Sequence, residues 1–310
     1  MNLKRTWSSA EGSAVVRACE SMLPADKRLF YDPWAKYFLS FKYSGFIFQE
    51  MLGKIVLFKN IMPWYTQHAR KCIIWYIDRI YPGGYGFVIV RTRYFDDYLK
   101  FCLKAGINQL IILGSGFDAR AYRFQELKNK IDVFEVDQRG TMDRKIKLVK
   151  KIFGDLPDHV NYVTINFEKD SLADRLITSG YDPKRKSLFI WEAVSGYLTR
   201  KAVDETLEFV AMNSGFGSSI IFDYPDISFI NYPNQSYEAA KLHSYHSKIG
   251  EPPKFGVDKN EIVQFLSKRG YFNIKSMNAK SLKKRYIEIR NDNIAISPFF
   301  HFATADILKR

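Results

Sequence analysis

Short apolar runs alternate with longer amphipathic segments through the middle of the chain. Apolar runs bounded by polar or glycine residues are typical of strands that are buried on both faces of a parallel sheet. They predict strands at Gln109–Gly114, Asp132–Asp137, Asn161–Asn166, Ser187–Ala193 and Ser218–Tyr224. Helical spacing between them predicts helices at Arg120–Lys128, Thr141–Phe153, Ser171–Thr178 and Arg200–Met212. This alternation predicts an α/β fold with a Rossmann-like, doubly wound, mostly parallel sheet.

The two ends of the chain have different patterns. After a predicted helix at Lys259–Tyr271, the runs Phe272–Asn278 and Ile294–Ile307 predict two antiparallel strands that complete a seven-stranded sheet. Residues 1–105 show no clear strand pattern, and apolar spacing there predicts helices within Gly12–Leu23, Thr66–Tyr81 and Arg91–Gly106. We therefore expect a helical N-terminal cap over residues 1–105 and a ligand-binding domain over residues 106–310.

One segment interrupts the strand–helix alternation. Residues 225–257 are rich in Tyr, Asn, His and Pro and follow the fifth predicted strand. Long loops inside compact domains usually serve a function. We expect this segment to be an insertion that forms a lid over the ligand edge of the sheet.

The charge balance changes this picture little. The chain has 47 Lys and Arg against 33 Asp and Glu, a net charge of +14. A nucleic-acid footprint needs basic residues clustered on one face, whereas here they are spread along the whole sequence and the densest run, SLKKRYIEIRND, contains acids. Compositional bias is favoured over a nucleic-acid partner, and the pattern indicates no particular oligomeric state.

Cysteine use and hydropathy point to a cytoplasmic protein. The three cysteines, Cys19, Cys72 and Cys102, are scattered and have neither metal-site nor disulfide spacing. The N-terminus lacks the apolar core of a signal peptide. Charged and amide side chains interrupt the most apolar early stretch, Ser44–Trp64, so we expect no membrane span.

The stretch LIILGSGFDARAYRF, Leu110 to Phe124, is the first candidate ligand site. Gly114 and Gly116 follow a buried strand directly, and such turns bring backbone N–H groups close to a nucleotide. Asp137 ends the next strand 23 residues after Gly114, where an acid binds a ribose diol. This pair fits dinucleotide-binding folds and methyltransferases alike, although the third glycine of GxGxxG is missing. Asp118 is expected to cap the following helix.

Four motifs together are more specific than the glycine turn. ILGSGFDARAYRF, FEVDQ, IWEAVSGYLT and RTRYFDDYL resemble the leucine carboxyl methyltransferase family, and VVRACES, FYDPWAKYF and GEPPKFGV extend the resemblance over nearly the whole chain. The resemblance implies a class I S-adenosylmethionine-dependent O-methyltransferase. The acceptor would be a carboxylate or hydroxyl of a small molecule or of a peptide C-terminus.

The resemblance also implies a set of cofactor-binding residues. Arg91 would pair with the methionine carboxylate, with Arg93 as its rival, and Arg17 would reach the same group. Gly114, Ser115 and Gly116 would form the turn against the amino-acid end of the cofactor.

The other implied residues follow later strands. Asp137 would bind the ribose, with Glu135 two positions earlier as its rival. Asn166 and Phe167 stand where the family commonly has Asp-Leu against the adenine, and an amide keeps an acceptor oxygen for the adenine amino group. Glu192 would lie at the carboxyl edge of the sheet.

No catalytic residue is assigned from the sequence. A carboxylate acceptor is already ionised at neutral pH, whereas a hydroxyl acceptor needs a base. The candidates to line the acceptor pocket or accept a proton are Tyr197, Tyr224, His243 and His246. The two histidines lack a third metal ligand, so no metal is expected. A nucleic-acid methyltransferase, a nicotinamide-dependent oxidoreductase and a non-catalytic cofactor-binding protein remain alternatives.

Overall fold

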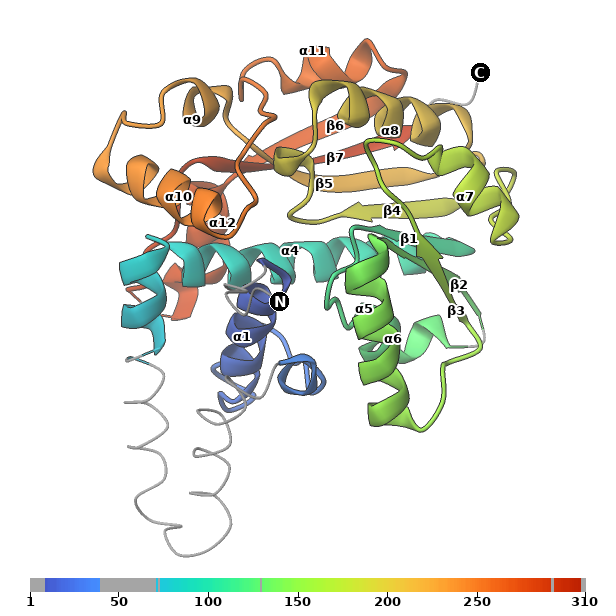
Figure 1. Ribbon diagram of the computed structural model, residues 1–310, viewed down its shortest axis with the longest axis horizontal. Helices are drawn as coiled ribbons and strands as arrows, with labels where there is room; N and C mark the ends of the chain where they lie inside the picture. The colour runs from blue at the N-terminus through green and yellow to red at the C-terminus, as the bar shows by residue number, and fades with distance from the viewer. Residues whose placement is uncertain (1–8, 40–70, 72, 129, 291–292, 308–310) are drawn as a thin grey trace, which may run out of the picture.

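A seven-stranded sheet runs through the computed structural model, which describes residues 9–39, 71, 73–128, 130–290 and 293–307 (Figure 1). The strand order is β3-β2-β1-β4-β5-β7-β6. β1 to β5 pair in parallel, and β7 is antiparallel to both of its neighbours. The predicted fold class is therefore confirmed. The strands are β1 (Gln109–Leu113), β2 (Asp132–Asp137), β3 (Val160–Thr164), β4 (Ser187–Trp191), β5 (Ser219–Pro225), β6 (Tyr271–Asn278) and β7 (Phe300–Ile307).

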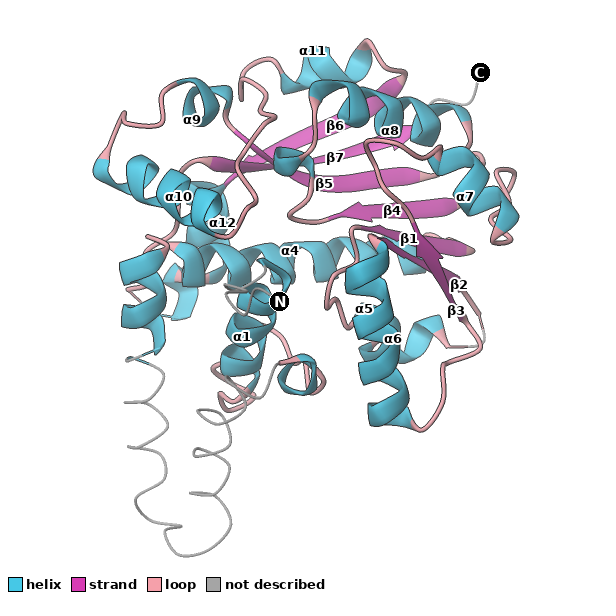
Figure 2. Cartoon of the chain, viewed as in Figure 1, coloured by secondary structure: helices cyan, strands magenta, loops and turns pink. Residues whose placement is uncertain are grey.

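Helices cover both faces of the sheet, so the described residues form three layers (Figure 2). One face packs against α1 (Ser9–Ser21), α4 (Gly84–Lys104), α5 (Arg120–Arg123), α6 (Arg139–Phe153) and α12 (Ala279–Tyr286). The other face packs against α7 (Leu172–Thr178), α8 (Arg200–Met212) and α11 (Ile262–Ser267). Alternate residues of the central strands enter the two cores: Leu110 and Ile112 face α4, whereas Ile111 and Leu113 face α8.

The N-terminal region is helical where it is described, and no strand occurs among its described residues before Gln109. Besides α1 and α4 it contains a helical segment at 73–80 and the short 3-10 helix Ala35–Phe38. α4 begins at Gly84, earlier than the predicted start at Arg91, and the residue before it, Gly83, has a φ of 68° that glycine adopts readily. Arg91 consequently lies inside the helix. The predicted boundary between residues 105 and 106 stays a prediction.

The predicted lid is largely helical, rather than the long loop that its polar, aromatic composition suggested. It contains α9 (Ile227–Asn231) and α10 (Tyr237–Lys248). Asp226 and Ser236 accept hydrogen bonds from the first-turn N–H groups of Ser228 and Ala239 and so cap these helices. The two ends of the segment lie side by side, because Asp226 and Val257 form a β-bridge.

Several predicted boundaries are wrong. β7 begins at Phe300 rather than Ile294, since Pro298 cannot donate a ladder hydrogen bond. α5 ends at Arg123 instead of continuing to Lys128, and a separate 3-10 turn follows it. α11 spans only Ile262–Ser267 of the predicted Lys259–Tyr271 helix.

Some predictions concern residues outside the described ranges. They are those on the N-terminal eight residues, Ser44–Trp64, Cys72 and the beginning of the helix at Thr66. Cys19 and Cys102 are buried free thiols. None of the helices in the described ranges has an apolar stretch long enough to span a bilayer. In the same ranges, no His, Cys, Asp and Glu side chains gather in a metal-binding group.

Candidate active site

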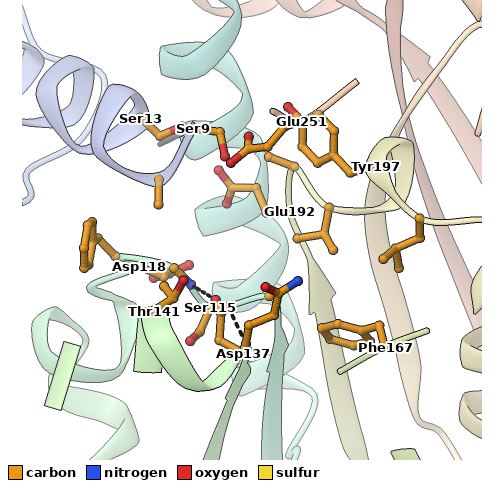
Figure 3. A pocket seen from close by; sticks show the side chains of 18 of the residues that line it. Ser9, Ser13, Ser115, Asp118, Asp137, Thr141, Phe167, Glu192, Tyr197 and Glu251 are labelled. Atoms are coloured by element: carbon orange, nitrogen blue, oxygen red, sulfur yellow. Dashed lines mark hydrogen bonds between the residues drawn. The ribbon is translucent and has the colours of Figure 1, made fainter. Parts of the chain in front are cut away.

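A cavity of about 380 Å³, here called the polar cavity, lies at the carboxyl ends of β1 to β4. In Figure 3, Ser9, Ser13, Glu251 and Tyr197 lie across this cavity from Ser115, Asp137 and Phe167. α1 and the chain after α10 thus close the cavity over the sheet edge. All nine residues expected to bind the cofactor line it: Arg17, Arg91, Gly114, Ser115, Gly116, Asp137, Asn166, Phe167 and Glu192.

The glycine turn forms the floor of the polar cavity. Gly114 and Gly116 both have positive φ angles, 67° and 46°. A Cβ on Gly114 would lie 2.2 Å from Cγ2 of Val194, so only glycine fits there. The Ser115 N–H donates to the carbonyl of Val136 at 2.9 Å, and this bond ties the turn to β2.

Asp137 completes the floor from the end of β2. Its carboxylate accepts hydrogen bonds from the N–H groups of Gly116 at 2.5 Å and Gln138 at 2.6 Å. Burial raises the pKa of Asp137, although these N–H donors favour the ionised form. Its rival Glu135 lies outside the cavity, fully buried, with Oε1 2.9 Å from Lys145 Nζ. The structure therefore places Asp137, not Glu135, in the cavity.

A buried ionic cluster forms one wall. Arg91 Nε donates to Glu192 Oε1 at 2.9 Å, and Arg120 Nη1 donates to Glu192 Oε2 at 2.6 Å. Burial opposes ionisation of Glu192, but the two guanidinium groups lower its pKa, so it stays charged. Arg120 also pairs with Asp96 and Asp118. Beside Arg120, and against the effect of burial, the pKa of Asp118 falls to about 2.

The other basic candidates have different surroundings. Arg17 lines the polar cavity while its Nε donates to Asp32 at 2.9 Å. Arg93, the rival of Arg91, does not line the cavity, and it binds Asp97 and the carbonyl of Leu29. Of these two residues of α4, Arg91 is therefore the one that lines the cavity.

A second cavity of about 230 Å³, here called the apolar cavity, adjoins the first. Both cavities are lined by Ser9, Ser13, Arg91, Ala193 and Tyr197, so the cavities meet at these five residues. The apolar cavity is walled mainly by hydrophobic and aromatic side chains from α1, segment 73–80, α4 and α10, among them Val16, Ile77, Ile80, Phe87, Tyr245 and Ile249. An apolar cavity with a few polar groups is typical of a small-molecule site.

A recess of about 30 Å³ extends from the junction of these two cavities toward β5. It is lined by Tyr81, Arg91, Tyr197, Asp223 and His246 among others. Burial raises the pKa of Asp223 to about 6, because the nearby Arg91 offsets only part of the desolvation. Burial lowers the pKa of His246 to about 4, with His243 adding to the effect, so the imidazole is neutral at physiological pH.

The four acceptor-site candidates fall into two groups. Tyr197 lines all three cavities, and His246 lines the apolar cavity and the recess. The Tyr197 hydroxyl lies 3.4 Å from Nδ1 of His246. Tyr224 instead contacts Ser276 Oγ at 3.2 Å, and His243 Nε2 contacts the carbonyl of Phe229 at 2.6 Å. Neither of these two lines any of the three cavities.

Sequence reasoning assigned no role to three residues of the site. Arg120 stood in the quoted motif without a role, and Tyr81 was only the end of a helix. Asp223 was the last residue but one of the strand predicted at Ser218–Tyr224, and that position near the carboxyl edge was the one signal that could have identified it.

Comparison with known proteins identifies the family of the chain. A sequence model of the leucine carboxyl methyltransferase family matches residues 10–211. The chain belongs to this family. YktD of Bacillus subtilis (strain 168), named an S-adenosyl-L-methionine-dependent methyltransferase, is 26% identical over 294 residues, 94% of this chain and 95% of YktD. A relative from Mycolicibacterium smegmatis with the same kind of name is 33% identical over 180 residues, 58% of this chain and 57% of the relative.

Solved structures agree on the fold. A DUF574 family protein from Streptomyces avermitilis matches 77% of this chain and 91% of its own, with 14% identity and a TM-score of 0.53. A Thermobifida fusca structure described as a methyltransferase matches 78% of this chain and 89% of its own, with 13% identity and a TM-score of 0.50. At this identity the likeness concerns the fold alone.

The family member described here is an S-adenosylmethionine-dependent methyltransferase, which confirms the family and the cofactor predicted from the motifs. The polar cavity suits that cofactor on its own chemistry. The Ser115 hydroxyl is buried against it without a hydrogen-bond partner among the described residues. A basic and an acidic side chain, Arg91 and Glu192, stand at the end that would meet an amino-acid zwitterion. An acid and an aromatic ring, Asp137 and Phe167, stand where a nucleoside would lie.

Proposed function

We propose that this methyltransferase transfers the methyl group to an oxygen atom, a carboxylate or a hydroxyl, of a small molecule or a peptide C-terminus with a largely apolar body. The observation that carries the proposal is the apolar cavity, which meets the polar cavity at Arg91, Ala193 and Tyr197. Its hydrophobic walls suit an apolar body, and the polar groups at its inner end suit an oxygen-bearing head. Family membership supports an oxygen acceptor.

The proposal assigns the residues of the polar cavity to parts of S-adenosylmethionine. Arg91 and Arg17 hold the methionine carboxylate, and the charged Glu192 attracts the α-ammonium group. Asp137 accepts hydrogen bonds from the ribose hydroxyls. Asn166 and Phe167 contact the adenine. Each of these side chains lines the cavity.

Bound S-adenosylmethionine supplies an electrophilic methyl group, and the chain's part is to place the acceptor. Well-oriented placement of two reactants can contribute roughly 7–11 kcal/mol. Tyr81, Phe87 and Tyr245 restrict how an acceptor lies in the apolar cavity. The ring of Tyr81 stands edge-on to the ring of Tyr245, with centroids 5.3 Å apart. These packed rings give the cavity a defined shape.

Other functions fit the site less well. Family membership sets aside the nicotinamide-dependent oxidoreductase. A nucleic-acid methyltransferase would draw support from the net charge of +14, but a base bound mainly to aliphatic and tyrosine side chains would lose most of its hydrogen bonds. If RNA or DNA were the acceptor, binding would weaken steeply with salt. We propose a cytoplasmic location from the scattered cysteines, of which Cys19 and Cys102 are buried free thiols.

The test combines the purified protein with methyl-tritiated S-adenosylmethionine and a small-molecule extract of cells that express it. Methyl esters release volatile methanol in mild alkali, whereas methyl ethers do not. We expect label in an ester or ether fraction, and loss of that label in Arg91→Ala, since that variant should also bind S-adenosylhomocysteine less tightly. Label found only on nitrogen, sulfur, carbon or nucleic acid would reject the proposal.

A further inference from the structure

Asp223 at the carboxyl end of β5 has no role in holding the cofactor, yet it lies where the cavities meet. Its Oδ1 accepts a hydrogen bond from the N–H of Ala193 at 2.6 Å. Ala193 lines the polar cavity, the apolar cavity and the recess, and Asp223 lines the recess. The carboxylate is therefore one hydrogen bond away from the junction at which an acceptor and a methyl donor would meet.

The backbone at this junction is strained. Ala193 has a φ of 59°, and only one other non-glycine residue in the described ranges, Asn273, has a positive φ. Residues held in this region store strain and are concentrated at functional sites. The bond from Ala193 to Asp223 helps to hold this conformation, so Oδ1 has a structural task.

The second carboxylate oxygen of Asp223, Oδ2, has a distant ionic partner in Arg91. Asp223 Oδ2 lies 3.5 Å from Arg91 Nη1, beyond the usual length of a charged hydrogen bond. Arg91 Nε meanwhile donates to Glu192 at 2.9 Å, so that guanidinium is held mainly by another acid. The Asp223 side chain is 5% exposed, so little water competes for Oδ2. Because Arg91 Nη1 is an ion-pair partner at 3.5 Å and not a close hydrogen-bond donor, Oδ2 can accept a proton from an acceptor in the recess.

The charged and titratable groups around Asp223 come from several elements. They are Arg91 on α4, Glu192 after β4, His246 on α10, and Tyr81 and Tyr197. Burial raises the pKa values of both tyrosines, and Arg91 and Glu192 stay charged. Burial lowers the pKa of His246 to about 4 and raises the pKa of Asp223 to about 6. Of these groups, Asp223 is the one whose change of protonation falls just below neutral pH, where a general base works best.

We propose that Asp223 is the general base of this enzyme and that its acceptor is a hydroxyl group rather than a carboxylate. The inference rests on the proposed function. The acceptor oxygen forms a bond to the methyl carbon, the C–S bond breaks, and its electron pair stays on sulfur to give neutral S-adenosylhomocysteine. The hydroxyl proton passes to Oδ2 of Asp223, and the other product is a methyl ether.

The test uses 4-propylphenol and 4-propylbenzoate as probes, because they share an apolar body and differ in the reacting oxygen. Asp223→Asn keeps an oxygen for the Ala193 N–H but cannot take the proton. For the phenol we expect kcat to fall about 100-fold or more, the range of general-base catalysis, with S-adenosylhomocysteine affinity unchanged. For the benzoate, any transfer should change only a few-fold.

A pH profile separates a base from a residue that merely supports the fold. In the unsubstituted enzyme, kcat/KM for the phenol should rise as pH passes through about 6, as Asp223 ionises, and this limb should be absent in Asp223→Asn. The matched control is Asp78→Asn, because burial raises the pKa of Asp78 to about 6 as well and Asp78 lines none of the three cavities. The Asp78→Asn variant should keep the rise of kcat/KM near pH 6. Should Asp223→Asn fail to fold, Asp223→Glu should move the pH at which kcat/KM rises.

The outcomes are distinct. Asp223→Asn with full activity on the phenol, or with the limb intact, would overturn the role of Asp223. Methylation of the benzoate alone would overturn the hydroxyl acceptor and leave the proposed function standing. An enzyme that binds S-adenosylmethionine and methylates neither these probes nor any oxygen in the cell extract would reject the proposed function itself.

Discussion

Gly114 is the residue at which a single methyl group should disturb both the fold and the cofactor site. Its φ of 67° costs an L-residue about 1–2 kcal/mol. The Cβ of Gly114→Ala would lie 2.2 Å from Val194 Cγ2, a distance that real contacts do not reach. Overpacking of this kind typically costs about 1–3 kcal/mol. We therefore expect Gly114→Ala to lower the free energy of unfolding by about 2–5 kcal/mol, the sum of these two effects.

Two other glycines provide matched controls. Gly116 also has positive φ (46°), but the nearest atom to its Cβ would be Ala10 Cβ at 3.2 Å, so Gly116→Ala should lose mainly the backbone contribution of about 1–2 kcal/mol. A Cβ on Gly140 in α6 has open space, so Gly140→Ala should be neutral or stabilise by up to about 1 kcal/mol. Urea unfolding with unchanged m-values measures all three.

A second substitution isolates the clash. Val194→Ala removes the methyl groups that the new Cβ would meet, so Gly114→Ala with Val194→Ala should recover about 1–3 kcal/mol relative to the sum of the single variants. Val194 also lines the polar cavity, and its displacement in Gly114→Ala should weaken S-adenosylhomocysteine binding. Stability of Gly114→Ala within about 0.5 kcal/mol of the unsubstituted protein, the usual range for neutral surface changes, would refute this reasoning.

Three further predictions concern charged groups. Asp137→Asn should raise the Kd of S-adenosylhomocysteine about 10- to 100-fold by calorimetry, since hydrogen bonds to a charged group contribute about 1.5–3 kcal/mol; an unchanged Kd would remove Asp137 from the site. Arg120→Met removes the buried cation that pairs with Glu192, Asp96 and Asp118 at once and should destabilise the fold by about 3–5 kcal/mol in urea, while a loss under about 1 kcal/mol would contradict a coupled cluster. His246 binds a proton near pH 6.5 when unfolded but near 4 when folded, so its contribution to stability is full above 6.5 and falls as the pH drops toward 4. When the pH falls from 7 to 5, the free energy of unfolding should drop by about 2 kcal/mol less in His246→Gln than in the unsubstituted protein. Equal drops in the two proteins would refute the lowered pKa of His246.

The sheet and the polar cavity could be predicted because their signals are local. A strand such as β1 is buried along its whole length, so its sequence is a continuous apolar run. The carboxyl ends of parallel strands share one edge, which brings the residues after β1, β2, β3 and β4 together without any knowledge of helix packing. Asp137 was predicted from a local signal as well, its position at the end of a strand 23 residues after Gly114, and it lines the polar cavity.

The apolar cavity could not be predicted, since its walls come from elements whose packing leaves no local signal. Arg91 meets a carboxylate 101 residues away, at Glu192. The apolar spacing of segment 73–80 and of α10 indicates a buried face but not which partner covers it. The role of Arg120 was missed for the same reason, because its partner Asp96 belongs to α4, in the predicted cap.

Ser9 and Ser13 on α1 line the polar and the apolar cavity at once. A ligand in either cavity rests against the same turn of helix, so filling one should restrict the wall of the other. Coupling between two binding sites is reciprocal: whatever factor the cofactor adds to acceptor affinity, the acceptor must add to cofactor affinity. We therefore expect a bound acceptor to change the Kd of S-adenosylmethionine by the same factor as the cofactor changes the Kd of the acceptor.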